Sequence, residues 1–345
     1  MKIGKYLVRF IAIASVSIMS ITSMAAELPI LKLDTAIKSA VNTNSTVSVY
    51  EKQITAINEQ MYNTADVSST SYQTNNIQKQ DYAKKITYIE DATAYNVTKL
   101  YNKIVLLKKQ MAFSDIKVAM KEKEFKQLEI KYRSGYISKL DYELASSQIE
   151  ELKKSKVTLE ADLEDARAEF NRLAKYDINY YTLEENFEFQ DYTYVGNVQR
   201  YFHESVDEIL KYDQELAELR QSRVGYDLFE AGDTSLANYY TGKANAASQV
   251  NSVELTKQNY ITTLNSMYSN LTSIGQNIKV LQNQIVDAQK SLNAKKIKYE
   301  VGYISSMEIE KDEVALEEMQ LNLLEMITNH NSIKEAIRKP WVSFF

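Results

Sequence analysis

Apolar residues recur at alternating steps of four and three positions along two long stretches of the chain. The first ladder comprises Leu100, Ile104, Leu107, Met111, Ser114, Val118, Lys121, Phe125, Leu128 and Tyr132, and the second comprises Met267, Leu271, Ile274, Ile278, Leu281, Ile285, Ala288, Leu292, Lys295 and Tyr299. An apolar repeat of about 3.5 residues over this length is the spacing of a coiled-coil seam. The pattern predicts two long helices, over about residues 81–133 and 243–300.

Each ladder ends in the same short turn. Residues 129–138 read EIKYRSGYIS and residues 296–305 read KIKYEVGYIS, so seven of ten positions are identical at an offset of 167 (302 − 135). Gly135 and Gly302 suit the left-handed conformation that ends many helices. After each glycine, a serine and an acid three positions later have the spacing of a capping box, which starts a new helix. These pairs are Ser138 with Asp141 and Ser305 with Glu308.

The apolar ladders resume after both turns, from Ile149 and from Leu316, so the duplicated unit is a long antiparallel helical hairpin. The chain has only two prolines, Pro29 and Pro340, which leaves the span between them free of the residue most hostile to helix interiors. We therefore predict an all-α fold of duplicated coiled-coil hairpins with no or minimal β-structure.

Shorter helices are expected ahead of the two hairpins, and polar loops are expected between helices. The helices would cover about 34–64 and 198–224, the loops about 66–80 and 230–242, and a Tyr- and Phe-rich linker at 176–197 would be extended or form a short strand. The domain organisation predicted from this pattern is a first repeat with its linker over 27–190 and a second repeat over 191–345.

Residues 1–26 have the order of a cleavable signal peptide: three basic residues, an apolar run, and small residues ending at Ala26. The alternative is an uncleaved membrane anchor, although the apolar run is shorter than the roughly 20 residues that a spanning helix needs. The chain has no cysteine, which excludes disulfides and a lipid-modified N-terminal cysteine. The mature protein is expected in the cell envelope, outside the cytoplasmic membrane.

Charge and residue usage disfavour several classes of function. The net charge is −5 without a long run of one sign, which argues against a nucleic-acid partner. Two histidines and no cysteine leave little for metal or nucleophilic chemistry, so no cofactor is expected. His330 falls on a ladder and is predicted to be a packed histidine. An enzyme such as a carboxylate-dependent wall hydrolase is a distant alternative, because helical hairpins offer no obvious pocket.

The opening LKLDTAIKSAVNTNS, the duplication, and the turns KYRSGYISKLDY and KYEVGYISSMEI together resemble the TolC-like outer-membrane efflux proteins. The resemblance covers nearly all of the mature chain. It implies a transport protein, a homotrimer whose long helices form a hollow α-barrel, with hairpin tips that meet the periplasmic adaptor of an ABC-type or other export pump. Membrane contact would then be indirect or peripheral.

The resemblance also assigns roles to the tips. The adaptor-docking residues would be Gly135, Tyr136, Ile137, Ser138, Gly302, Tyr303, Ile304 and Ser305, and the entrance constriction or latch would comprise Asp141, Tyr299 and Glu308. Docking has a further argument: capping does not require apolar residues at an exposed tip, where a partner would gain about 25 cal/mol for each Å² of apolar surface it covers. Self-packing of the tip is the alternative. The sequence departs from the family pattern at Lys311, in place of an acid, and at Ile304, in place of an arginine.

The polar loops are a larger departure, because the family places a membrane β-hairpin in each. Two membrane strands need about 9–11 residues each, and DVSSTSYQTNNIQKQ offers fifteen mostly polar residues. We therefore expect a variant that lacks the membrane strands. The function predicted is an exit duct, and the alternative is a non-conducting coiled-coil scaffold of the envelope. The C-terminal segment WVSFF is compatible with either a membrane contact or docking onto the helices.

Overall fold

Two very long helices dominate the computed structural model, which describes residues 28–64, 66–185 and 187–345. The elements are β1 (Ile30–Leu31), α1 (Leu33–Asn42), α2 (Ser45–Tyr62), α3 (Thr70–Arg133), α4 (Lys139–Ala174), η1 (Ile178–Tyr180), β2 (Thr182–Leu183), α5 (Val198–Glu230), α6 (Leu236–Glu300), α7 (Ser306–Arg338) and η2 (Pro340–Ser343). With 64 and 65 residues, α3 and α6 are each roughly 100 Å long at about 1.5 Å per residue. The predicted signal peptide, residues 1–26, lies outside the described residues.

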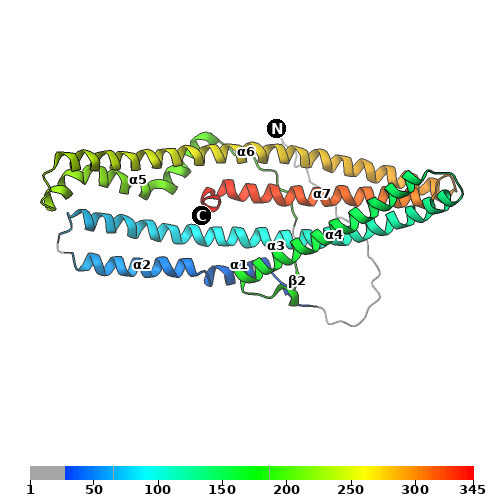
Figure 1. Ribbon diagram of the computed structural model, residues 1–345, viewed down its shortest axis with the longest axis horizontal. Helices are drawn as coiled ribbons and strands as arrows, with labels where there is room; N and C mark the ends of the chain where they lie inside the picture. Colours follow the sequence, from blue (N-terminus) through cyan, green and yellow to red (C-terminus); the bar gives the residue numbers. More distant parts are fainter. Residues whose placement is uncertain (1–27, 65, 186) are drawn as a thin grey trace, which may run out of the picture.

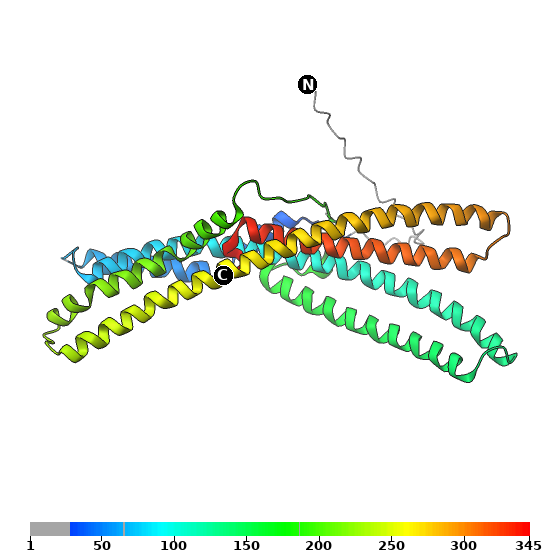
Figure 2. The same ribbon diagram turned by 90° about the horizontal axis from the view of Figure 1, so that it is seen from above.

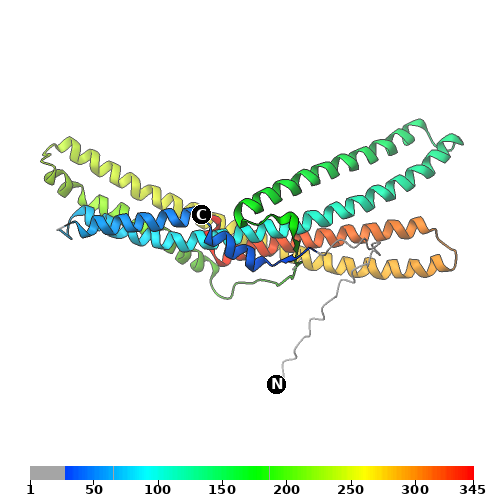
Figure 3. The ribbon, with the colours of Figure 1, turned by 90° about the horizontal axis from the view of Figure 1, so that it is seen from below.

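The molecule is elongated, and α3 and α6 run along its length in the same direction (Figure 1). The α3–α4 and α6–α7 turns lie at one end, here called the tip end. The α2–α3 and α5–α6 connections lie at the other, here called the loop end. Toward the tip end the two hairpins diverge, as the views from above and below show (Figures 2 and 3).

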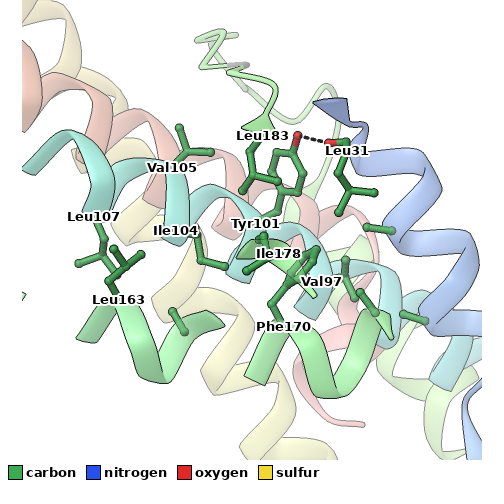
Figure 4. Close-up of a cluster of buried hydrophobic side chains, with 14 residues drawn as sticks. Leu31, Val97, Tyr101, Ile104, Val105, Leu107, Leu163, Phe170, Ile178 and Leu183 are labelled. Atoms are coloured by element: carbon green, nitrogen blue, oxygen red, sulfur yellow. Dashed lines mark hydrogen bonds between the residues drawn. The ribbon is translucent and has the colours of Figure 1, made fainter. Parts of the chain in front are cut away.

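Each repeat contributes a core near the middle of the molecule. The first joins α1, α3, α4 and the linker (Figure 4), and includes Val97, Tyr101, Ile104, Leu107, Leu163, Phe170, Ile178 and Leu183. The second joins α3, α5, α6 and α7, and includes Tyr88, Phe202, Val206, Ile209, Leu210, Leu264, Leu271 and Ile337. Ile104 with Leu271, and Phe170 with Ile337, are equivalent in the 167-residue repeat. The predicted apolar ladders are therefore confirmed as packing seams in this region.

Three sequence-based boundaries were wrong. The helix α5 ends at Glu230 rather than near 224, and α3 and α6 begin at Thr70 and Leu236 rather than near 81 and 243. Ser69 and Ser235 cap these helices, each accepting a hydrogen bond from a backbone N–H in the first turn. The polar residues that follow had been assigned to loops. Polar residues are compatible with a helix that packs on only one side, and α2 and α5 supply that side here.

The helix expected over 34–64 is divided in two. Asn44 separates α1 from α2: its side-chain oxygen accepts from the backbone N–H of Thr46 at 2.9 Å, and its amide nitrogen donates to the Thr93 hydroxyl of α3 at 2.8 Å. This side chain therefore caps α2 and at the same time ties the break to the long helix. An asparagine with no proline or glycine nearby does not by itself predict the end of one helix and the start of another, so the sequence contained no clear sign of this break.

The strands among the described residues are β1 and β2, which form one parallel pair of two residues each. The Tyr101 hydroxyl donates to the carbonyl of Leu31 at 2.8 Å (Figure 4). It also accepts a hydrogen bond from the backbone N–H of Glu184 at 2.7 Å. One buried side chain of α3 thus holds both ends of the first repeat. The expectation of minimal β-structure and of a short strand in the linker is confirmed.

The C-terminal segment docks onto the helices. The Trp341 ring stacks on Tyr88 with centroids 5.1 Å apart, and its indole nitrogen donates to Asp91 at 2.9 Å. His330 is also inside the molecule, 1% exposed and edge-on to Phe189. Burial lowers the pKa of His330, so the imidazole stays neutral near pH 7. The prediction of a packed histidine is confirmed.

Candidate docking tips and entrance

Both tip turns have the same backbone geometry. Gly135 and Gly302 have φ of 76° and 80°, in the left-handed region predicted for them. The Tyr136 N–H donates to the carbonyl of Lys131 at 2.8 Å, and the Tyr303 N–H donates to that of Lys298 at 2.9 Å. The Gly135 and Gly302 N–H groups also donate, to the carbonyls of Tyr132 and Tyr299, both at 2.9 Å, and the two bonds in each turn form a Schellman motif at the end of each long helix. A left-handed residue is required at both positions.

The predicted capping boxes are present. Ser138 Oγ accepts from the Asp141 N–H at 3.1 Å, while the Ser138 N–H donates to the Asp141 carboxylate at 3.3 Å. Ser305 and Glu308 make the same reciprocal pair at 3.4 and 3.3 Å. Asp141 and Glu308, the two acids expected at the entrance, are thus held in the first turns of α4 and α7. Each is exposed and bonded to the backbone of its own N-cap serine.

Side-chain exposure separates the apolar tip residues into two groups. Tyr136 and Tyr303 are 83% and 82% exposed. Ile137 is half-buried, and Ile304 packs against a small core of the second tip that contains Leu292. Ile304 therefore takes part in the packing of its own tip, and the two tyrosines present the apolar surface that a partner can cover.

The two tips differ in their internal packing. In the first tip, the Tyr142 ring stacks on Tyr132 with centroids 4.8 Å apart and lies 5.0 Å from Phe125. The position equivalent to Tyr142 in the second tip is Ile309, which is buried in an aliphatic cluster. The sequence analysis missed this aromatic stack, although Phe125 and Tyr132 belong to the first ladder and Tyr142 lies opposite them on a hairpin.

Ion pairs join the two hairpins behind the tips. They connect α3 with α7 at Lys117–Glu318 (2.9 Å), Lys123–Glu310 (2.8 Å) and Lys311–Glu124 (2.8 Å). Lys311 is the residue that replaces the acid of the family pattern, so its charge finds a partner on the other hairpin. Glu124 also pairs with Lys121 at 2.7 Å, and its side chain is only 17% exposed.

Glu124 is the most shielded acid of this contact. Burial raises the pKa of its carboxyl, but hydrogen bonds and the charges of Lys121 and Lys311 outweigh burial and lower it overall. Because the folded-state pKa is depressed, Glu124 contributes stability above its ordinary pKa range, and this contribution is lost as the pH falls through the folded-state pKa. Nothing in the sequence indicated these ion pairs between the two hairpins.

Tyr299, the other predicted latch residue, is half-exposed and makes no hydrogen bond to the first tip within the described part of this chain.

Among residues 28–64, 66–185 and 187–345, no group of three or more His, Cys, Asp or Glu side chains is arranged to hold a metal ion. None of the helices described there is both long enough and apolar enough to cross a membrane.

Comparison by sequence gives no match: neither a protein-family model nor a curated protein matches the chain. Comparison by structure gives several. A membrane protein from Pseudomonas aeruginosa superposes with a TM-score of 0.63 at 11% identity, over 90% of this chain and 92% of that one. The open state of the Neisseria gonorrhoeae MtrE outer membrane channel gives a TM-score of 0.62 at 10% identity, over 90% and 88%. The Campylobacter jejuni CmeC outer membrane channel gives 0.58 at 11% identity, over 91% and 86%.

These matches span nearly the whole of both chains, so they concern the complete architecture rather than one shared hairpin. At this level of identity they establish the fold. The chain has the fold of TolC-like outer-membrane channels, and the resemblance found in its sequence is confirmed at that level.

Proposed function

We propose that the protein is the exit duct of an export system, which conducts its cargo without catalysing a reaction and docks through its hairpin tips onto an adaptor of the membrane-fusion type. The observation that carries the proposal is the match of about 90% of the chain to outer-membrane channels. The placement of both tips at one end, each with an outward tyrosine, supports docking there.

A duct requires several copies, since one chain forms only a section of wall. In the tip half the helices lie in the order α4, α3, α7, α6, so α4 and α6 are the free edges. Both edges expose large apolar side chains, namely Leu140, Leu144 and Val157 on α4 and Val280 and Ile297 on α6. Such residues favour edge-to-edge packing of copies, and a closed homotrimer is the assembly we propose.

The mass and shape of the purified mature protein test this assembly. Light scattering is expected to give about three times the mass of one chain, which is 39.6 kDa before removal of any signal peptide. Small-angle scattering is expected to give the profile of a hollow, elongated particle. A monomer or a solid rod would contradict the duct and favour a coiled-coil scaffold instead.

Replacing both tip glycines by valine is expected to abolish adaptor binding and export while the protein remains folded. A Cβ at either position meets open space, so the substitution causes no clash. The left-handed conformation, however, costs a β-branched residue about 1–2 kcal/mol, which is expected to unwind the turn and displace Tyr136 and Tyr303. Adaptor binding is measured by co-purification with the cognate adaptor, and folding by circular dichroism.

Gly232 provides the matched control, because it has φ of 72°, also meets open space, and lies at the loop end. Gly232→Val is expected to carry a similar backbone cost and to leave adaptor binding intact. If the double tip variant binds the adaptor as well as the Gly232→Val variant does, the tips are not the docking surface.

A further inference from the structure

The loop end carries a group of exposed apolar side chains that the proposed duct does not explain. This loop-end patch comprises Tyr62, Val67, Phe229, Leu236 and Tyr240, each between 63% and 88% exposed. Tyr62 is the last residue of α2 and Leu236 the first of α6, so the side chains project from helix ends. The start or the end of a helix does not require a large apolar residue, and exposing such a side chain to water is unfavourable.

The two connections that bear the patch are joined to each other. The Arg223 guanidinium of α5 donates to the Ser68 carbonyl of the first connection at 3.2 Å. The Thr70 hydroxyl of α3 donates to the Asp227 carboxylate of α5 at 2.6 Å. These bonds hold the end of α5 against the α2–α3 connection, so the segments that carry the patch are fixed to one another at this end of the molecule.

The charges at this end are mainly negative. The acids are Asp66, Asp227, Glu230 and Asp233, and each accepts a hydrogen bond from a nearby side chain or backbone group. Two copies meeting end to end would bring these carboxylates together, and like charges at such a contact oppose association. An anionic lipid surface is disfavoured for the same reason.

The groove at this end offers no apolar pocket to an anchor side chain of a protein partner. Strong protein contacts depend on apolar anchors that fill pockets. The groove at this end, between α2 and α3, is lined instead by uncharged polar side chains, among them Gln60, Asn63, Thr70 and Asn75. A lipid surface needs no pocket, because each projecting side chain inserts separately. Tyrosine is enriched at the headgroup level of bilayers, and phenylalanine and leucine are typical of the apolar face of helices that lie in the membrane interface.

We propose that the loop-end patch inserts into the interfacial region of an electrically neutral lipid surface and so attaches this end of the molecule peripherally to a membrane. The direction of the duct, with its tips facing away from that membrane, rests on the proposed function. The lipid contact itself rests on the patch and its charges.

Flotation of the purified mature protein with phosphatidylcholine vesicles tests the contact. The natural protein is expected to float with the vesicles, and adding phosphatidylglycerol is expected not to strengthen binding. Phe229→Ser combined with Leu236→Ser is expected to weaken binding about tenfold or more, since two large apolar side chains no longer enter the interface. The matched control combines Tyr136→Ser with Tyr303→Ser, which removes equally exposed side chains at the tip end and is expected to leave vesicle binding unchanged.

Fluorescence locates the contact independently. Trp341 is the single tryptophan of the chain and lies far from the loop end, within the second core. Phe229→Trp adds a second emitter in the patch, which brominated phosphatidylcholine is expected to quench while the emission of Trp341 is unaffected. The proposal is overturned by a natural protein that does not float, by equal losses in the tip-end control, or by an unquenched tryptophan at position 229. End-to-end association in light scattering without lipid overturns it in favour of a second copy. These outcomes leave adaptor binding and side-by-side assembly untouched, so failure here is distinguishable from failure of the proposed function.

Discussion

Phe170→Ala is expected to lower the free energy of unfolding by about 3–5 kcal/mol. Phe170 is fully buried at the centre of the first core, with its ring 6.3 Å from that of Tyr101 (Figure 4). Truncation removes its own apolar contacts and leaves a cavity, because the long helices on either side cannot collapse into it. Urea denaturation followed by circular dichroism at 222 nm measures the loss.

Two variants calibrate this result. Ile337→Ala removes the residue at the equivalent position of the second repeat, also fully buried, and is expected to cost about 2–5 kcal/mol. Phe229→Ala truncates a largely exposed phenylalanine and is expected to change stability by less than about 0.5 kcal/mol. A Phe170→Ala cost close to that of Phe229→Ala would mean that the first core does not hold the repeat together.

The sequence predicted the features that follow from local rules. The 167-residue repeat placed Ile104 and Leu271 on equivalent seams, and both are buried. The glycine, the serine and the acid of each turn predicted the left-handed helix end and the capping box, because these depend only on residues within one turn. The hairpin architecture follows from these two elements together, since a turn between two amphipathic helices forces them to pack.

Features that depend on distant partners could not be predicted. The segment after Ser69 is polar enough for a loop, and only its packing against α2 explains why it is helical. Tyr136 and Ile137 are equally apolar neighbours, so the sequence could not tell which one faces outward. The pairing of Lys311 with Glu124 joins residues that lie far apart in the chain, and a single sequence contains no signal for it. The loop-end patch was also missed, because its five members come from four separate elements or turns.

Trp341→Ala is expected to lower the free energy of unfolding by about 2–4 kcal/mol, although the residue lies only four positions before Phe345, the last described residue. The indole covers Tyr88 of α3, and its N–H donates to Asp91 of the same helix. Asp91 also accepts from Lys339 at 2.7 Å, so the segment is bound to α3 by charge as well as by stacking. Removing the ring should release the C-terminal end of α7 from α3.

Trp341→Phe separates the two contributions. It retains an aromatic ring over Tyr88 but loses the hydrogen bond to Asp91, for which a cost of about 1–2 kcal/mol is expected. Because Lys339 still pairs with Asp91, the carboxylate is not left alone. If both substitutions leave the urea midpoint unchanged, the C-terminal segment does not contribute to stability. If they cost the same, the hydrogen bond to Asp91 rather than the ring holds the C-terminal segment on α3.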